Sequence, residues 1–302
     1  MDGVLIIDKP EGPTSHDVVN RVRRILKTKR VGHTGTLDPF ATGVLILVIG
    51  KATRLAQFLD KDEKEYDAVV RFGFETDTGD RTGMRNAECG LRNEELSSRL
   101  ARVDWEEVLS RFRGNIRQTP PMFSAKKVDG KKLYEHARKG IEVGREPINV
   151  TITNLEIMEH EQFRTPNSAL RIRVVCSAGT YVRTLAEDIG RAVGVGAHLE
   201  ELRRTRAGRF SIEEAVSLEA LENADDPSKY LRPMDEAVAH MPAFILLDDR
   251  IEKTMSGLAT RVERNELKAG EAVRMLDGDG GLVAIGTYQS KEGSIKPKIV
   301  LV

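Results

Sequence analysis

The segment from residue 30 to residue 45 constrains the fold of this chain more than any other stretch. It contains three glycines, one proline, one histidine and a single carboxylate, Asp38, and it continues into an apolar run at 44–49. Glycine permits positive φ angles and proline fixes φ, so this density indicates a shaped loop. The apolar run that follows is typical of a buried strand. Pro39 also restricts the backbone of Asp38 to extended conformations.

A shaped loop beside a buried strand is a place where a rigid scaffold can present one reactive side chain. Asp38 is the candidate, because it is the only carboxylate in the segment. An aspartate before a proline is, however, a common turn former or helix cap. The loop alone therefore favours a structural role for Asp38, and the rest of the chain has to decide between this role and catalysis.

Length and composition indicate a soluble protein with one large and one small domain, or with two medium-sized domains. The chain has 302 residues, of which 40% are hydrophobic and 31% are charged, and this is enough for a substantial core. The apolar run at 44–49 is far too short to cross a membrane, and the N-terminus lacks a basic secretory signal. Cys89 and Cys176 stand far apart, which predicts reduced thiols in a cytoplasmic protein and neither a disulfide nor a zinc site.

The formal net charge is zero, but the charges are unevenly distributed along the chain. Residues 21–30 hold six basic residues and no acidic one, residues 111–150 hold ten basic and four acidic residues, and four arginines lie within 203–209. Basic zones of this kind can give a neutral protein one face that binds a polyanion. A solvated helix face explains any single cluster equally well.

Hydrophobic periodicity predicts a mixture of helices and strands over the first 240 residues. A helix is expected from Ser15, which is a good N-cap residue, to residue 26. Strands are expected at 4–7, 44–49, 66–74, 148–159 and 170–176, the last two as a pair. Further helices are expected at 51–59, at 94–112 as two helices around Asp104, from the turn at 179–184 to about residue 192, and from residue 216.

Two regions differ from this pattern. Residues 118–147 are basic, irregular and poor in apolar residues, so we expect a projecting insert with a hairpin turn at 128–132 and a basic helix at 133–139. After residue 240, short apolar runs separated by glycine and aspartate predict a small β-barrel of about 60 residues. The predicted domains are therefore 1–240 and 241–302.

The residues leave several kinds of site unsupported. The six histidines are scattered without the spacing of a zinc site, and there is no G-x-S-x-G nucleophile elbow. No second carboxylate can be paired with Asp38 from the sequence, so a glycosidase-like pair is unsupported. The glycines at 190, 194 and 196 lack the dinucleotide-binding spacing. Asp38, Tyr66, Arg183 and the basic zones remain as the candidates for function.

Residues 32–45, GHTGTLDPFATGVL, closely resemble the catalytic motif of the bacterial tRNA pseudouridine synthase B family. Other segments resemble further motifs of this family in the same order. These are LIIDKP at 5–10, KEY at 64–66, TDTGD at 76–80, the RNA-gripping thumb at 121–140, CSAGTYVRT at 176–184, GAHL at 196–199 and LRRTRAG at 202–208. The resemblance covers residues 3–218; it is looser over 241–302, which are similar to the family's RNA-binding PUA-type module.

The resemblance implies an α+β pseudouridine synthase fold with a mixed, mostly antiparallel central sheet and a small C-terminal β-barrel-like (PUA-type) domain. The implied reaction isomerises the uridine at position 55 in the T loop of tRNA to pseudouridine, with no cofactor and no metal ion. The base is detached from ribose through N1, rotated and reattached through C5. The implied partner is the T arm of tRNA, and we expect a cytoplasmic monomer that needs no membrane, guide RNA or protein partner.

The family's site residues correspond to residues of this chain through the shared motifs. The resemblance implies Asp38 as the nucleophile, Arg183 as its cationic partner and Tyr66 as a stacking and proton-transfer residue. The sequence does not decide whether Asp38 attacks C6 of uracil or C1′ of ribose. The implied substrate-binding residues are His33, which helps to flip the base, and Lys9, Tyr181, Leu202, Lys126, Lys127, Lys131, Lys132, Arg138 and Lys139.

Two other classes of protein share some of these features. An RNA-binding protein or tRNA-folding chaperone could have the same fold without the activity, but the presence of Asp38, Tyr66 and Arg183 together favours an enzyme. A glycosidase-like base-removing enzyme lacks an identifiable second carboxylate. Because the chain starts close to its first predicted strand, we expect the stand-alone form and not a guide-RNA-dependent relative.

Overall fold

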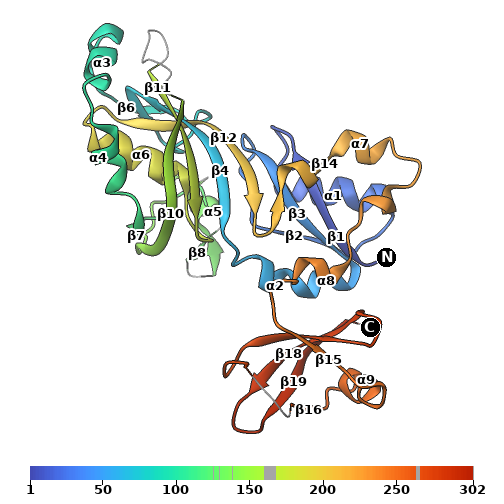
Figure 1. Cartoon of the computed structure of the whole chain (residues 1–302). Coiled ribbons are helices and arrows are strands. Elements are labelled where there is room, and N and C mark those ends of the chain that lie inside the picture. Colours follow the sequence, from blue (N-terminus) through green and yellow to red (C-terminus); the bar gives the residue numbers. More distant parts are fainter. Residues whose placement is uncertain (125, 129, 138, 160–167, 263–265, 302) are drawn as a thin grey trace.

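One large mixed sheet organises most of the chain (Figure 1). The computed structural model describes residues 1–124, 126–128, 130–137, 139–159, 168–262 and 266–301. Within these residues, ten strands join in the order β14-β1-β3-β12-β4-β11-β10-β7, while β2 pairs with β3 and β13 with β12. The strands are β1 (Gly3–Lys9), β2 (Val31–Thr34), β3 (Thr42–Ile49), β4 (Lys64–Phe72), β7 (Gly114–Gln118), β10 (Ile148–Glu159), β11 (Ala169–Cys176), β12 (Ala197–Ala207), β13 (Phe210–Ser211) and β14 (Val216–Ser217).

Two of these pairings are parallel, β1 with β14 and β3 with β12, and the others are antiparallel. This confirms the predicted mixed, mostly antiparallel sheet. The expected strands at 148–159 and 170–176 are present as the antiparallel pair β10 and β11. The expected strand at 66–74 is divided into β4 and the short β5 (Phe74–Thr76), which pairs with β6 (Arg85–Glu88).

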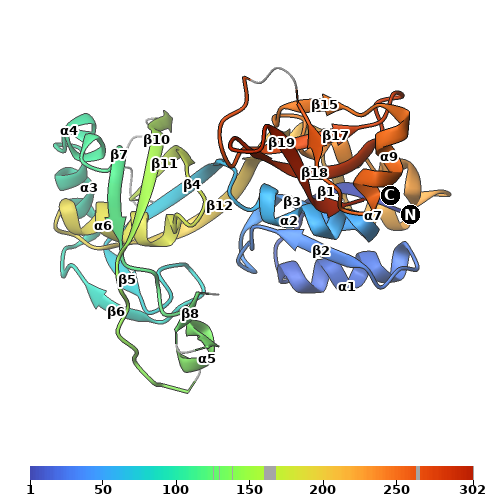
Figure 2. The same cartoon turned by 90° about the horizontal axis from the view of Figure 1, so that it is seen from below.

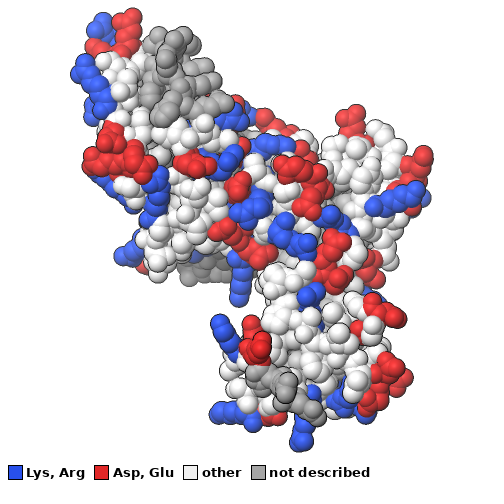
Figure 3. Space-filling view, viewed as in Figure 1, with Lys and Arg blue, Asp and Glu red and all other residues white. Residues whose placement is uncertain are grey.

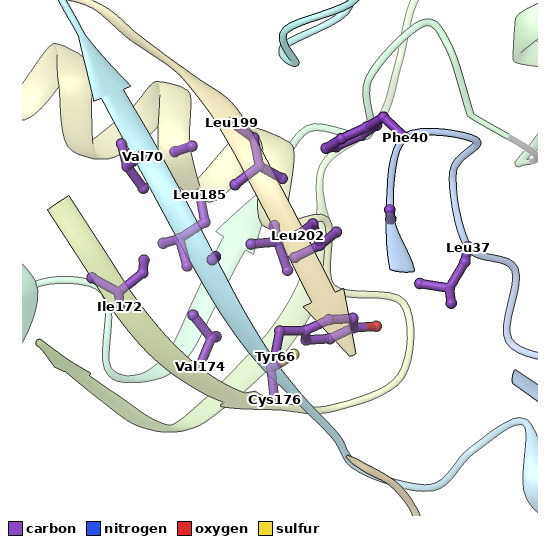
Figure 4. Packing of buried hydrophobic residues seen from close by; sticks show 14 of the residues in the cluster. Leu37, Phe40, Tyr66, Val70, Ile172, Val174, Cys176, Leu185, Leu199 and Leu202 are labelled. Atoms are coloured by element: carbon purple, nitrogen blue, oxygen red, sulfur yellow. The ribbon is translucent and has the colours of Figure 1, made fainter. Parts of the chain in front are cut away.

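Helices α1 (Ser15–Ile25) and α6 (Val182–Ala192) lie on the same face of the sheet and bury its main core (Figure 2). Along β4 the even-numbered residues are buried and the odd-numbered ones are half-exposed, as expected when one face of a strand packs on a core. In Figure 4, Leu185 of α6 lies against Val70 and Leu199 from two neighbouring strands.

The strands β1 and β3 are covered on both faces. Val44, Ile46 and Val48 belong to a second apolar cluster with Ala52 and Leu59, which come from the 3-10 helix Gly50–Leu55 and from α2 (Ala56–Leu59). A strand that is buried on both faces needs apolar residues at every position. This explains the continuous apolar run at 44–49, and the expected helix at 51–59 is a 3-10 turn followed by α2.

The sequence did not predict β12, which occupies the middle of the sheet between β3 and β4. Its arginines hid the strand pattern, and two of them form ion pairs with acidic residues of other segments. Arg203 contacts Asp8 at 2.8 Å, and Arg206 contacts Glu63 at 3.0 Å. Figure 3 shows basic and acidic side chains interleaved over one face of the molecule. The arginine cluster at 203–209 is therefore engaged in internal contacts to a large extent.

The caps and ends of the helices can be compared with those that the sequence predicts. Thr14, and not Ser15, is the N-cap of α1, because its side chain accepts a hydrogen bond from the backbone of Asp17. The Ser15 hydroxyl therefore does not cap the helix and can bind another group. The expected helix pair around Asp104 is present as α3 (Asn93–Leu100) and α4 (Trp105–Ser110), and Asp104 caps the second helix.

A second sheet lies at the C-terminal end of the chain (Figure 1). It contains β15 (Ala243–Ile245), β16 (Thr260–Arg261), β17 (Ala272–Leu276), β18 (Leu282–Gln289) and β19 (Ser294–Val300), in the order β15-β17-β18-β19-β16. The sequence missed β16 and the helix α9 (Asp248–Met255). The sheet curls as a half-barrel and packs on the first part of the chain through an apolar cluster that includes Leu55, Val238 and Ile285. The domain boundary after residue 240 stays a prediction.

The predicted insert at 118–147 projects from the domain (Figure 2). Its described part contains the hairpin β8 (Lys127–Val128) and β9 (Lys131–Lys132) and the helix α5 (Leu133–Ala137), which is shorter than expected. The backbone of Tyr134 donates to the carbonyl of Ser124, and this bond ties α5 to the base of the insert. We call residues 118–147 the thumb.

The remaining short elements connect these units. They are α7 (Leu218–Glu222), α8 (Met234–Ala237) and the 3-10 turns Ile212–Glu214 and Pro227–Tyr230. Among the described residues, no helix is long and apolar enough to cross a membrane.

Gly43 marks the closest approach between β3 and β12, where it is the register partner of Arg204. Its φ angle is +100°, and a Cβ atom placed on it would lie 2.2 Å from the carbonyl oxygen of Arg204. Gly12 has a similar φ of +106°, but a Cβ there would have no neighbour within 4 Å. An alanine at position 12 would therefore introduce backbone strain alone, whereas an alanine at position 43 would also overlap the partner strand.

We expect Gly12→Ala to lower the free energy of unfolding by about 1–3 kcal/mol, through backbone strain alone. Gly43→Ala should lower it by more than about 4 kcal/mol or prevent folding, because two backbones that pair in the sheet would have to separate. Urea unfolding of the two variants beside the wild type measures the difference. Equal losses would contradict the importance of this close approach.

Candidate active site

A cavity of about 260 Å³ lies where the loop between β2 and β3 meets β4, β12 and the start of α6. Asp38, Tyr66 and Arg183, the three residues that the sequence predicts as catalytic, all line it, together with Tyr181 and Leu202. The other lining residues are Gly35, Thr36, Leu37, Asp60, Lys64, Ser124, Ser177, Ala178, Gly179, Thr180, Val182 and Arg204. The cavity therefore joins segments that are far apart in the sequence.

The loop that carries Asp38 is held from outside by α1. The Ser15 hydroxyl accepts from the backbone N–H of Leu37 at 2.9 Å and donates to the Leu37 carbonyl at 3.1 Å. Both atoms that Ser15 binds belong to the residue before Asp38. A turn closes the loop on the other side, since the N–H of Ala41 donates to the carbonyl of Asp38.

Lys9 also supports the loop that carries Asp38. Its side chain is fully buried, and its ammonium group donates to the carbonyls of Pro10, Pro39 and Ala41 at 2.7–3.1 Å. Burial lowers the pKa of Lys9 to about 8, and the nearby charge of Asp38 opposes this shift. The sequence predicts Lys9 as a substrate-binding residue. Its contacts point to an indirect role, in which it holds the part of the loop that directly follows Asp38.

Arg183 binds the Asp38 carboxylate with two nitrogens. Its Nε lies 3.0 Å from Oδ2 and its Nη2 lies 3.2 Å from Oδ1. The guanidinium also donates to the carbonyls of Thr78 and Phe123, each at 2.9 Å. The Arg183 side chain is only 6% exposed. The two-point contact with Asp38 therefore holds the carboxylate in one orientation.

Asp80 is the second carboxylate of this site, and the sequence analysis did not select it. It contacts Nη1 of Arg183 at 3.4 Å, and its Oδ1 accepts hydrogen bonds from the hydroxyls of Thr78 and Thr82 at 2.9 and 2.6 Å. The signal was present as the TDTGD segment, in which threonines surround the acid. Only the fold shows that this acid meets an arginine 103 residues further along.

The environment of Asp38 is poorly solvated and strongly charged. Burial raises the pKa of the Asp38 carboxyl and the charge of Asp80 adds to this effect, while Arg183 and Lys9 oppose it. About one third of the side chain (32%) remains exposed toward the cavity. The carboxylate is thus poorly solvated but reachable, and its charge is balanced mainly by one guanidinium. Desolvation of this kind increases the nucleophilicity of a carboxylate.

Tyr66 comes from a buried position of β4, and in Figure 4 its hydroxyl points toward the loop that carries Leu37. Burial raises the pKa of the Tyr66 hydroxyl, while the charge and a hydrogen bond of Arg204 oppose the shift. The phenol is therefore neutral at physiological pH. Arg204 is a further residue that the sequence analysis missed as a site component.

The remaining predicted residues near the base are distributed around the cavity. Leu202 of β12 is 8% exposed and forms part of the wall. Tyr181 is the N-cap residue of α6, and its backbone exchanges two hydrogen bonds with the side chain of Gln118. His33 is half-buried in β2. Its strand leads directly into Gly35, where the cavity lining begins.

The thumb contributes the predicted cationic residues. Lys131 and Lys139 are exposed, whereas Lys126 is half-buried and donates to the carbonyl of Glu146 at 3.4 Å. Lys127 and Lys132 are register partners in the hairpin. The predicted Arg138 lies outside the described residues. Phe123, whose carbonyl binds Arg183, connects the base of the thumb to the site.

No cluster of three or more metal-ligating side chains is found in the part of the chain that the structure describes.

Two family models match the chain. Residues 23–182 match the TruB family pseudouridylate synthase (N terminal domain), and residues 183–239 match the tRNA pseudouridylate synthase B C-terminal domain. Neither match extends into the C-terminal sheet.

Known relatives are similar over nearly the whole length of the chain. The tRNA pseudouridine synthase B of Azoarcus sp. (strain BH72) is 44% identical over 304 residues, which cover 99% of this chain and 94% of that protein. The tRNA pseudouridine synthase B of Bacillus subtilis (strain 168) is 38% identical over 307 residues, which cover 100% and 98%.

Two solved structures of larger complexes contain a chain with a similar fold. A chain in the crystal structure of a Cbf5-Nop10-Gar1 complex superposes with a TM-score of 0.72 at 28% identity, over 99% of this chain and 85% of that chain. A chain in the structure of an H/ACA RNP bound to a substrate RNA containing 2′-deoxyuridine gives a TM-score of 0.71 at 27% identity, with the same coverage.

Proposed function

The chain belongs to the TruB family of pseudouridylate synthases and isomerises uridine to pseudouridine in tRNA, and from this premise we propose that Asp38 is the nucleophile and uridine 55 of the T loop is the target. One observation carries the proposal. The Asp38 carboxylate faces a cavity and is fixed by two nitrogens of a buried Arg183. An aimed and poorly solvated carboxylate is the main chemical requirement of this reaction.

The substrate base has to leave the RNA before it can reach Asp38. A uridine in a folded T loop is stacked, and unstacking it costs a few kcal/mol or so. The cavity of about 260 Å³ beside Tyr66 and Leu202 would receive the flipped base. Tyr66 offers an aromatic face for stacking, and Leu202 offers an apolar wall. We assign His33 to the position that the base vacates, because β2 leads into the rim of the cavity.

The reaction breaks the bond between N1 and C1′ and forms a bond between C5 and C1′. The Asp38 carboxylate can assist in two ways, by adding to C6 of the uracil or by attacking C1′ as the base departs. Either step produces a covalent intermediate and later regenerates the carboxylate, so no cofactor is consumed. Arg183 would hold the carboxylate in line with the attacked carbon, and Asp80 would fix Arg183 from behind.

One proton has to leave C5 and one has to be added to N1 during the isomerisation. Tyr66 is the candidate for this exchange, because its phenol lines the cavity and is neutral at rest. A phenol that first donates its proton to the detached base can accept the proton from C5 afterwards. The proton from C5 thus replaces the proton that Tyr66 donated, and no external acid or base is needed.

Binding of the T arm would depend on the thumb and on the C-terminal sheet, which we assign to RNA contact as a PUA-like unit. Exposed lysines such as Lys131 and Lys139 are suited to phosphate contacts. The relatives that match nearly the whole chain are named as tRNA enzymes. We therefore propose a monomer that acts in the cytoplasm on tRNA without a guide RNA or a protein partner; sedimentation of the protein with and without tRNA would test this.

Release of tritium from RNA that contains 5-tritiated uridine tests the function directly, because C5 loses its hydrogen only when it bonds to C1′. We expect the wild type to release one equivalent per T-arm RNA, and none when uridine 55 is replaced by cytidine. Asp38→Asn should reduce release to background. Asp60→Asn is the matched control, because Asp60 also lines the cavity and its side chain accepts a hydrogen bond from the Gly35 N–H, which an asparagine oxygen can also accept.

Each part of the proposal can fail separately in this assay. No release by the wild type would reject uridine 55 as the target. Normal release by Asp38→Asn would reject Asp38 as the nucleophile, and equal losses for Asp38→Asn and Asp60→Asn would indicate a general loss of charge in the cavity.

Ser15 and Thr14 allow a test of how the loop is positioned. Ser15→Ala removes both bonds to Leu37, while Thr14→Ala removes the helix cap of α1. Both variants should lose about 1–2 kcal/mol of unfolding free energy. Only Ser15→Ala should lower the single-turnover rate, by about 10-fold or more, because a small displacement of a reacting group is costly. Equal rates in the two variants would show that Ser15 is not needed to position Asp38.

A further inference from the structure

We propose that Arg204 is a positioning residue for this reaction, which directs the hydroxyl hydrogen of Tyr66 into the cavity and joins both ends of the loop that carries Asp38. The inference rests on the proposed role of Tyr66 in proton transfer. It concerns a side chain that is 1% exposed in the middle of the sheet, where an arginine needs a specific reason to be present.

The position of Arg204 in the sheet places it directly beside Tyr66. In the antiparallel pairing of β12 with β4, Arg204 and Tyr66 are register partners. Side chains of such partners lie on the same face of the sheet and contact each other. Both residues also line the cavity that contains Asp38.

The guanidinium of Arg204 is fixed at two points of the backbone. Its Nε donates to the carbonyl of Val44 at 2.6 Å, and its Nη2 donates to the carbonyl of Gly35 at 2.9 Å. Gly35 is the first residue of the loop that carries Asp38, and Val44 lies in β3 just after the loop ends. The backbone of Arg204 is equally constrained, because it packs against Gly43 with no room for a Cβ atom.

The Tyr66 side chain lies beside Arg204 on the neighbouring strand, and its hydroxyl receives a hydrogen bond from Arg204. A guanidinium can donate hydrogen bonds but cannot accept them. When Arg204 donates to the Tyr66 oxygen, the hydrogen of the phenol must point to a different acceptor. The remaining space in front of Tyr66 is the cavity, so the phenol is oriented to donate toward the bound base.

The same contact supports the second half of the proton exchange. After the phenol has given its proton away, the resulting phenolate is stabilised by the positive charge beside it. The other ionisable groups that face Tyr66 are Asp38 and Cys176, and both disfavour the phenolate. Arg204 is the group that opposes them. A lysine nearby, Lys64, is directed to the carbonyls of Asp60 and Asp62.

An arginine that served only to hold the loop would need the two carbonyl contacts and no others. Its placement beside the phenol that we assign to proton transfer distinguishes the two roles. The matched control is Arg203, the preceding residue of β12, which points to the other face of the sheet and pairs with Asp8.

Single-turnover rates of Arg204→Lys, Tyr66→Phe and the double variant test the inference. We expect Arg204→Lys to be slower by about 10-fold or more, with tRNA affinity unchanged within a factor of about two, while Arg203→Lys keeps the wild-type rate. If Arg204 acts through Tyr66, the double variant is no slower than Tyr66→Phe alone. Losses that multiply in the double variant would overturn the inference.

A second measurement does not depend on catalysis. With ring-labelled tyrosine, NMR titration of the free protein reports the pKa of Tyr66, and the Tyr66→Phe spectrum assigns its signal. We expect a higher Tyr66 pKa in Arg204→Gln than in the wild type, and no change in Arg203→Lys. An unchanged pKa in a folded Arg204 variant overturns the inference even if Asp38 proves to be the nucleophile. If Arg204→Gln does not fold, the same titration is made with Arg204→Lys.

Discussion

The buried arginine between two carboxylates is the interaction on which the site depends. Arg183 contacts Asp38 and Asp80 and also the carbonyls of Thr78 and Phe123. A guanidinium is expensive to bury, and here the cost is offset by partners on several sides. These partners belong to the loop before β3, the segment after β5 and the base of the thumb. One side chain of α6 therefore contacts three segments that are far apart in the sequence.

A second constraint is the close approach of β3 and β12. The parallel pairing is short and centres on Gly43 and Arg204. Glycine is needed there because a side chain would overlap the partner strand. As a result, the end of the loop that carries Asp38, the wall of the cavity and the strand that carries Leu202 are fixed relative to one another. The loop is rigid because Ser15, Lys9 and this contact hold it from three directions.

The charges of the molecule serve two different purposes. On the uncovered face of the sheet, arginines and acids alternate and pair across strands, as Arg206 does with Glu63 (Figure 3). Such pairs solvate an exposed sheet face and contribute little to stability individually. On the thumb, Lys131 and Lys139 are exposed. The formal net charge of zero therefore does not mean that all charges are paired. Charges on the sheet face form ion pairs, whereas the thumb carries exposed cations.

The sequence by itself determined the local elements and indicated the candidate residues of the site. The glycines and Pro39 predicted the shaped loop around Asp38, alternation predicted β10 and β11, and the motifs pointed to Tyr66 and Arg183. These signals are local, because they depend on φ preferences and on residue periodicity within a few positions. Only the tertiary structure identified β12 as a central strand and Asp80 and Arg204 as members of the site. A buried arginine and a paired surface arginine look the same in a sequence, and the partners that distinguish them lie more than 100 residues away.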